Sequence, residues 1–221
     1  MTDRRRLLAG AADSELVRRC LVLQVRHAVD AQIDFIQIRE RDLEVSALIA
    51  LVSQAVAMAR GTRTRVVVND RLDVALACGA DGVHLRADSV PPAAARSIAP
   101  RGFVVGRSVH GAEEAIGVAA EVDYLIAGTV WPSASKPADH PLLGTSGLAE
   151  VVRAVGVPVL AIGGVTLERI ARVAASGAAG VAAIGLFMAP DSAAAGVCRA
   201  IPLRDAAEAA RTRFDTSGSA S

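Results

Sequence analysis

The chain has 221 residues, of which 52% are hydrophobic but only 3% aromatic, and its formal net charge is +1. So balanced a charge gives no overall field that would attract nucleic acid or an anionic membrane, and any anion site must be local. The mean hydropathy is +0.39, yet the purest apolar stretches, residues 155–165 and 181–190, are shorter than the roughly 18 residues that span a bilayer. We therefore expect one globular α/β domain with strands buried on both faces.

The cysteines and the N-terminal residues bear on the compartment. Cys20, Cys78 and Cys198 are odd in number, far apart and without metal-ligand spacing. The charged N-terminal stretch also lacks the apolar core and small-residue cleavage site of a secretory signal. Together these features predict a protein of the reducing cytoplasm.

Short β-branched runs alternate with stretches of helical spacing along the whole chain. The pattern predicts strands at Asp34–Ile38, Val66–Val68, Gly82–Leu85, Phe103–Gly106, Tyr124–Ala127, Val157–Ile162 and Val181–Ile184. It predicts helices at Ser14–Val29, Leu43–Ala59, Leu72–Cys78, Pro92–Ile98, Ala112–Ala119, Leu148–Val155 and Leu167–Ala175, with a weak first strand at Leu7–Gly10 and a last helix after Pro190.

Eight strand–helix units predict a single-domain (β/α)8 barrel with parallel strands and a degenerate first strand. The barrel domain is expected over residues 1–213, followed by a flexible tail over 214–221 rich in Ser, Thr, Gly and Ala. The alternative is an open doubly wound sheet, but no glycine fingerprint follows either of the first two expected strands.

Polar residues follow the expected strands, which is where the chemistry of a barrel is found. Arg39 and Arg41 alternate beyond the first clear strand, so both guanidinium groups can face one phosphorylated ligand; the simpler interpretation is an ion pair with Glu40. Asn69 and Asp70 end the next strand, where Asp70 suits either Mg²⁺ or a helix N-cap.

Lys136 is the only lysine among 24 basic side chains. It lies in a long connection from Gly128 to Ser146, flanked by Ser133 and Ser135, and such long loops are usually functional in compact domains. A compact ammonium suits an anionic oxygen that moves during a reaction. A lysine on an ordinary flexible loop is the alternative.

Glycines end the last two expected strands. Ile162-Gly163-Gly164 ends one strand and precedes a helix, and Ile184-Gly185 ends the following strand. Backbone amides of the loops after strands seven and eight form the phosphate site of many barrels, so we expect a second anion site there. The two sites, one cationic and one lined by amides, suggest transfer between two phosphorylated molecules held in one cavity.

The four histidines offer no metal site. His84 lies inside an expected strand and is predicted to be a hydrogen-bonded core residue rather than a catalytic group. His27 falls in the first helix, and neither His110 nor His140 has a second ligand at zinc spacing.

Six motifs together resemble the thiamine phosphate synthases and the related thiazole tautomerases, and the likeness is closer to the synthases. They are Phe35–Arg41, Val68–Arg71, Gly79–Leu85, Gly106–His110, Ser133–Lys136 and Ala161–Gly164, in the order of the family, over about residues 30–190. The resemblance implies a (β/α)8 barrel and an alkyl-transferring enzyme that joins an aminopyrimidine diphosphate to hydroxyethylthiazole phosphate. Diphosphate would leave first, and the thiazole nitrogen would capture the resulting carbocation.

The resemblance also implies roles for individual residues. Arg39, Ser108 and Lys136 would be catalytic, Asp70 would hold Mg²⁺, and Ser108 and Lys136 would contact the diphosphate. The aminopyrimidine diphosphate would be bound by Gln37, Ile38, Arg39, Glu40, Arg41 and Asn69, and the thiazole phosphate by Ser133, Ser135, Gly164, Ile184 and Gly185. Its partners would be small phosphorylated molecules, with no nucleic acid and no membrane, and a homodimer is compatible with the sequence.

The sequence departs from the family pattern at the second metal ligand. The synthases carry an acidic residue where Ser89 stands, so either Asp88 replaces it or the metal site is weakened, with Arg86 as a substitute charge. The tautomerases carry a histidine where Thr129 stands, and its absence here argues against a tautomerase. The two alternatives to the synthase are a thiazole phosphate tautomerase and a weak paralogue that only binds thiazole or thiamine phosphate.

Overall fold

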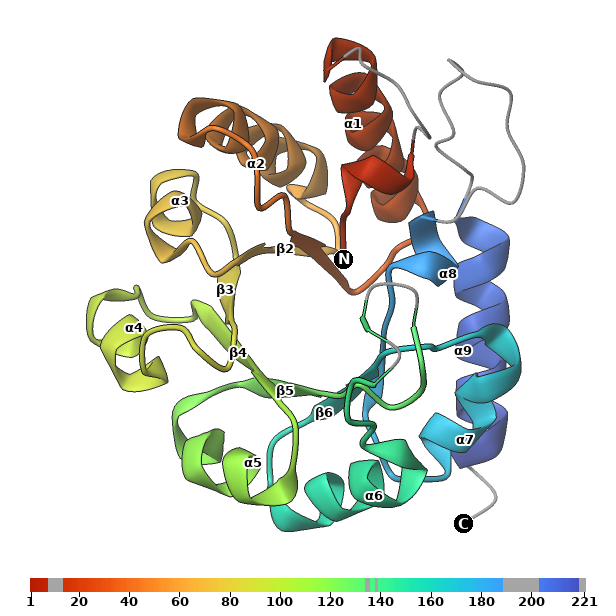
Figure 1. Cartoon of the computed structure of the whole chain (residues 1–221). Helices are drawn as coiled ribbons and strands as arrows, with labels where there is room; N and C mark the ends of the chain where they lie inside the picture. The colour runs from red at the N-terminus through yellow and green to blue at the C-terminus, as the bar shows by residue number, and fades with distance from the viewer. Residues whose placement is uncertain (8–13, 134–135, 138, 189–202, 219–221) are drawn as a thin grey trace. The chain divides into compact units, whose positions relative to one another are not determined.

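The computed structural model describes residues 1–7, 14–133, 136–137, 139–188 and 203–218 (Figure 1). Its contacts divide the chain into two compact units. The first comprises residues 1–83 and 184–207, and the second comprises residues 84–183 and 208–221. The single-domain expectation over 1–213 stays a prediction, and each unit is described by itself.

The first unit alternates strands and helices from the N-terminus. Its elements are η1 (Arg4–Arg6), α1 (Ser14–Asp30), β1 (Phe35–Ile38), α2 (Val45–Ala59), β2 (Arg65–Asn69), α3 (Leu72–Ala77), the first half of β3 (Gly82–Leu85), α8 (Gly185–Met188) and the start of α9 (Arg204–Gly218). Strands β1 and β2 pair in parallel, from Phe35 opposite Arg65 to Ile38 opposite Val68. Helices α1 and α2 lie side by side (Figure 1).

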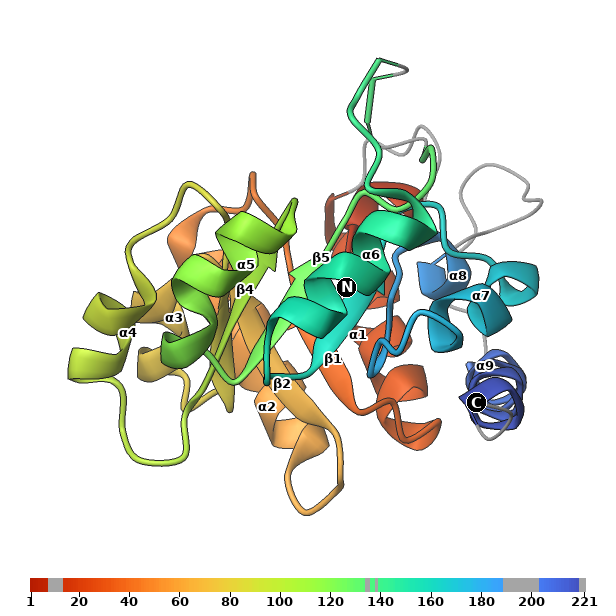
Figure 2. The same ribbon diagram turned by 90° about the horizontal axis from the view of Figure 1, so that it is seen from below.

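The second unit continues the same alternation. After the second half of β3 it contains α4 (Pro92–Ile98), β4 (Val104–Val109), α5 (Ala112–Val118), η2 (Ala119–Glu121), β5 (Tyr124–Ala127), α6 (Gly144–Ala154), β6 (Val159–Ile162), η3 (Leu167–Arg169), α7 (Ile170–Ala174) and β7 (Gly180–Ala182). Strands β4 to β7 pair in parallel in chain order. Helices α5 and α6 pack against each other, as both views show (Figure 2).

Burial follows the sequence pattern that predicted the elements. In α2 the buried residues Leu48, Leu51, Val52, Ala55 and Ala59 recur every three or four positions, which places them on one face of the helix. Every residue of β3 and β5 is buried, as expected for strands covered on both faces. Each buried Val or Leu contributes about 1.5–3 kcal/mol of transfer free energy.

An aspartate makes the same pair of hydrogen bonds in the turn before β3, in the first unit, and in the turn before β5, in the second unit. Asp81 accepts a hydrogen bond from the Val66 amide at 2.7 Å through Oδ2, and its own amide donates to the Val66 carbonyl. Asp123 makes the same pair of bonds with Val105. Both aspartates therefore fix the point where a strand begins.

All seven well-patterned strands occur within three residues of their expected bounds. The weak strand at Leu7–Gly10 is different: Leu7 ends η1 and is not in a strand, and residues 8–10 lie outside the described part. The N-terminal residue that pairs beside β1 is instead Thr2, whose amide donates to the Gln37 carbonyl at 2.9 Å. The expectation is therefore wrong for Leu7, and for residues 8–10 it stays a prediction.

The expected C-terminal tail is wrong in part. Helix α9 spans Arg204–Gly218, so residues 214–218 continue a helix, and only 219–221 of the expected tail lie outside the described residues. No helix in the described ranges is both long and apolar enough to cross a bilayer. Cys78 carries a free thiol, Cys20 is disulfide-bonded and Cys198 is outside the described part. The compartment and the homodimer stay predictions.

Candidate functional site

The ends of β1 and β2 bring two amide side chains together. Gln37, which is 5% exposed, donates from Nε2 to Oδ1 of Asn69 at 2.9 Å. The two residues come from neighbouring parallel strands, whose carboxyl ends meet at one edge. This contact fixes the Asn69 amide and leaves its nitrogen as a donor for a ligand. Two of the residues expected to bind the aminopyrimidine therefore lie in contact.

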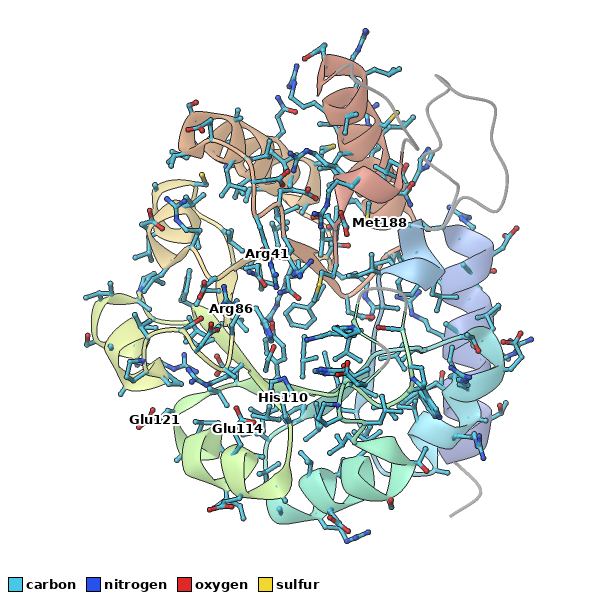
Figure 3. The ribbon with its side chains drawn as sticks, in the orientation of Figure 1. Arg41, Arg86, His110, Glu114, Glu121 and Met188 are labelled. Carbon is cyan, nitrogen blue, oxygen red and sulfur yellow. The ribbon has the colours of Figure 1, made fainter. Side chains whose placement is uncertain are left out.

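Arg39 and Arg41 follow β1 with different environments. Arg39 is half-buried, and its amide donates to Oγ1 of Thr2 at 2.9 Å. Burial, followed by the charge of Arg41, lowers the pKa of Arg39, although a guanidinium stays charged in proteins. Arg41, which is labelled in Figure 3, is exposed. The repulsion between two such cations is relieved by an anion, which favours a phosphorylated ligand here.

Glu40 does not form the ion pair with Arg39 or Arg41 that the simpler interpretation predicted. It is 6% exposed and accepts from the Arg4 amide at 3.1 Å and from Arg4 Nη1 at 3.0 Å. Burial raises the pKa of Glu40, while Thr2 and Arg4 oppose that shift. Arg4 also pairs with the exposed Asp42 at 2.8 Å. The Glu40 carboxylate thus anchors the N-terminal segment, and the expected role of Glu40 in substrate binding stays a prediction.

Ile38 was also expected to bind the pyrimidine. Its side chain is buried in the core of the first unit. A contact with a polar ligand would therefore have to come from its main chain.

The residues expected to hold Mg²⁺ lie in both units. Asp70 is half-buried between β2 and α3 and has a φ of 63°. Asp88 forms an ion pair with Arg86, and Oγ of Ser89 accepts from the Arg86 amide at 2.8 Å. Within the described ranges no group of three His, Cys, Asp or Glu side chains could hold a metal. The Asp70 carboxylate by itself suits a magnesium ion that takes most of its ligands from water and substrate oxygens, and the metal site stays a prediction.

Ser108 on β4 contacts a buried histidine in the second unit. Nε2 of His84 lies 2.8 Å from Oγ of Ser108, and Nδ1 of His84 lies 3.1 Å from the hydroxyl of Tyr124. His84 is 1% exposed. It is the hydrogen-bonded core residue that the sequence predicted, and its partner is a residue expected to be catalytic.

The segment after β5 runs beside the end of β6. The Val130 amide donates to the Ile162 carbonyl at 2.9 Å and the Trp131 amide to the Gly163 carbonyl at 3.1 Å. Gly163 and Gly164 have φ values of 100° and 62°, and a Cβ on either would lie within 2.5 Å of this segment. Only glycine permits both the backbone conformation and the close approach.

An arginine fastens the same turn. Nη1 of Arg169 donates to the Gly164 carbonyl at 2.7 Å, and its guanidinium carbon lies 5.3 Å from the centre of the Trp131 ring. This clamp was not predicted from the sequence, because Trp131 lies more than 30 residues before Gly164 and Arg169 and only folding brings its ring beside the guanidinium.

Lys136 is exposed, and its amide donates to the Ser133 carbonyl at 3.1 Å. Ser133 is half-buried, and Ser135 lies outside the described residues. The turn therefore presents the only lysine of the chain to solvent in the second unit.

The amide-lined phosphate site was expected from Gly164, Ile184 and Gly185. Gly164 belongs to the second unit, whereas Ile184 and Gly185 belong to the first, where Gly185 begins α8. The grouping of these glycines in one site, and of Arg39 and Asp70 with Lys136 in another, stays a prediction.

Comparisons with known proteins agree with the motifs. The family model of thiamine monophosphate synthase matches residues 8–187. A thiamine-phosphate synthase of Methanoregula boonei is 45% identical over 172 residues, which cover 77% of this chain and 80% of the relative. One of Methanospirillum hungatei is 38% identical over 188 residues, covering 83% and 90%.

A solved structure shows that the likeness extends to the fold. Thiamine phosphate pyrophosphorylase from Pyrococcus furiosus superposes with a TM-score of 0.76 at 31% identity, covering 89% of this chain and 90% of that one. Family model, relatives and structure all span most of the chain, and the residues matched by the family model include every motif described above. This chain belongs to the thiamine monophosphate synthase family.

Proposed function

We propose that this chain is a thiamine-phosphate synthase, which joins 4-amino-2-methyl-5-(diphosphooxymethyl)pyrimidine to hydroxyethylthiazole phosphate and releases diphosphate. The observation that carries the proposal is the Gln37–Asn69 contact with Arg39 and Arg41 beside it. Amide groups suit an aminopyrimidine, and paired guanidinium groups suit a diphosphate. Family membership points to the same reaction.

In the first unit, Gln37 and Asn69 would bind the pyrimidine ring while Arg39 and Arg41 bind its diphosphate. The Gln37–Asn69 hydrogen bond holds both amides in place before the substrate arrives. Such preorganisation lowers the entropic cost of binding. Arg39 is the stronger contributor, because a half-buried charge is screened less by solvent than the exposed Arg41.

In the second unit, Ser108 would donate to the diphosphate and Lys136 would follow its departing oxygens. Ser133, Ser135 and the amide of Gly164 would receive the phosphate of the thiazole, together with Ile184 and Gly185 of the first unit. The Arg169–Gly164 hydrogen bond holds the glycine turn in one conformation. Bare amides at a fixed turn suit a phosphate monoester.

The reaction would begin with cleavage of the bond between the pyrimidine methylene carbon and the diphosphate oxygen, whose electron pair leaves with the diphosphate. The methylene cation that remains would take the lone pair of the thiazole nitrogen, which forms the new C–N bond. No proton moves in this step, so no general base is required. Cationic groups accelerate it, since negative charge grows on the diphosphate as the bond breaks.

Magnesium would be held by the Asp70 carboxylate, with water and diphosphate oxygens as its other ligands. Bound there, it would neutralise part of the charge on the leaving diphosphate. Asp88 is a weaker candidate ligand because Arg86 already holds its carboxylate.

A complete (β/α)8 barrel is part of the proposal. The described part contains seven strands, and Thr2 occupies the free edge of β1 with a strand-like hydrogen bond to Gln37. The N-terminal residues would then stand in for an eighth strand, anchored by the Arg4–Glu40 pair.

The test is formation of thiamine phosphate by the purified chain from both substrates with Mg²⁺. Diphosphate should appear only when both substrates are present; release from the pyrimidine alone, or no product at high enzyme concentration, would contradict the proposal. Exchange of the proton of a thiazole carboxylate without the pyrimidine would indicate a tautomerase instead. Lys136→Ala should lower kcat about 100-fold or more and change the KM for thiazole phosphate less than threefold.

A further inference from the structure

A chain of three side chains crosses the interior of the second unit. Ser108 of β4, His84 of β3 and Tyr124 of β5 are joined by contacts of 2.8 Å and 3.1 Å. Each residue lies on a different strand, so this row of three contacting side chains depends on the fold and not on any local motif. Ser108 is its half-buried end, and His84 and Tyr124 are its buried members.

Gly106 makes room for this arrangement. It lies opposite Tyr124 in the parallel pairing of β4 and β5. A Cβ at Gly106 would lie 2.1 Å from Cζ of Tyr124 and 2.5 Å from its hydroxyl oxygen. The phenol can therefore reach His84 only because residue 106 has no side chain. The ring of His84 lies 5.6 Å from that of Tyr124, centre to centre.

Both inner members are held in their neutral forms. Burial, and secondarily the charge of Arg107, lowers the pKa of His84 to about 3. Burial, and secondarily the charge of Asp123, raises the pKa of Tyr124. A neutral imidazole has one donor nitrogen and one acceptor nitrogen. The direction of every hydrogen bond in the chain is therefore set by which nitrogen carries the proton.

Two arrangements satisfy these contacts. With the proton on Nδ1, His84 would donate to Tyr124 and accept the Ser108 proton at Nε2, which leaves Ser108 only lone pairs to offer. With the proton on Nε2, the Tyr124 hydroxyl donates to Nδ1, His84 donates to Ser108, and the Ser108 proton is free to point outward. Only the second arrangement suits a negatively charged oxygen.

We propose that His84 and Tyr124 are positioning residues that hold the Ser108 hydroxyl as a donor to an anionic phosphate oxygen of the substrate. Neither touches the substrate. Tyr124 selects the tautomer of His84, and His84 occupies the acceptor side of Ser108. The inference rests on the proposed function, because the anion is the diphosphate of the pyrimidine substrate. Replacing Tyr124 by phenylalanine removes the donor and with it the selection.

The first experiment reads the tautomer directly. Long-range proton–nitrogen NMR on the uniformly labelled, ligand-free chain distinguishes the two ring nitrogens of each of the four histidines, and His84→Gln assigns the relevant signals. The proton should be on Nε2 of His84 at neutral pH. A proton on Nδ1 would overturn the proposal. This measurement needs no substrate, so it stands whether or not the chain forms thiamine phosphate.

The second experiment is a double-mutant cycle in which calorimetry measures the affinity of each variant for inorganic diphosphate in the presence of Mg²⁺. Tyr124→Phe should weaken binding about tenfold in the otherwise unchanged chain and less than twofold in Ser108→Ala, because it acts through Ser108. Ser97→Ala, which removes an exposed hydroxyl on α4, is the matched control and should leave binding unchanged. Equal losses in both backgrounds would mean a general structural effect and would refute the positioning role.

Discussion

The strand end after β1 and the interior of β3, β4 and β5 use polar side chains in opposite ways. Arg39 and Arg41 place guanidinium groups at the border of solvent, and Glu40 contacts the guanidinium of Arg4. His84 and Tyr124 are so deeply buried that the neutral form of each is favoured. The first region can attract an anion by charge, whereas the second can only fix the direction of a hydrogen bond.

The largest expected effect comes from removing a charge at the strand end after β1. Arg39→Gln should lower kcat/KM for the pyrimidine diphosphate about 100-fold, or about 2.7 kcal/mol, because it removes a charge-assisted contact that solvent screens only in part. The loss should shrink as salt is raised, since salt weakens the charge contribution of the unchanged chain. Steady-state kinetics at two ionic strengths measure both. Arg101→Gln, an exposed arginine before β4, is the control, and an equal loss there would contradict a specific role.

The next effect concerns the buried anchor of the same region. Arg4→Met should lower the free energy of unfolding by about 2 kcal/mol, because Glu40 would remain buried without its cation. The value is below that of a fully buried pair since the Arg4 side chain is 18% exposed. Asp42→Asn, which removes only the exposed partner, should cost less than about 0.5 kcal/mol. Urea denaturation compares the two, and equal costs would show that burial of Glu40 does not matter.

The pH dependence of stability tests whether the buried His84 is neutral in the folded protein. The folded-state pKa of His84 is about 3, against 6.5 when unfolded, so below pH 6.5 the unfolded chain takes up a proton that the folded chain does not. Stability contributed by this residue is present above pH 6.5 and is lost as the pH falls towards 3. Between pH 7.5 and 5.5 the loss is about 1.4 kcal/mol. In His84→Gln, the fall in the free energy of unfolding between pH 7.5 and 5.5 should be smaller by about 1.4 kcal/mol, as measured by urea denaturation. An unchanged fall would show that His84 is protonated in the folded state.

The smallest expected effect tests the clamp on the glycine turn. Arg169→Ala removes the hydrogen bond to the Gly164 carbonyl and the contact with Trp131. It should cost about 1 kcal/mol of stability and raise the KM for thiazole phosphate a few-fold while leaving that for the pyrimidine unchanged. Arg172→Ala, an exposed arginine three residues further on, should change neither. A larger effect on the KM for the pyrimidine than on the KM for thiazole phosphate would contradict the assignment of this turn to the thiazole phosphate.

The sequence was sufficient for the strands, because runs such as Val66–Val68 and Tyr124–Ala127 are short, β-branched or apolar throughout and bounded by turn residues. It was sufficient for the family, because six motifs occur in a fixed order. It could not place Thr2 beside β1 or make Arg4 the partner of Glu40, since these contacts join segments about 35 residues apart. The helix that continues through residues 214–218 was missed because its last turn is polar and reads as a tail.

The interior of the second unit shows the same limit at the level of function. Sequence alone determined that His84 is a core residue, because a histidine inside an apolar strand must be buried, and it identified Ser108 by its motif. Only the tertiary structure decided that the two touch, since β3, β4 and β5 must be neighbours in the sheet, with a glycine opposite Tyr124, before the imidazole can bridge the two hydroxyls. Residue types and their local periodicity are written in the chain, but the direction of a shared proton depends on atoms that folding alone brings within hydrogen-bonding distance.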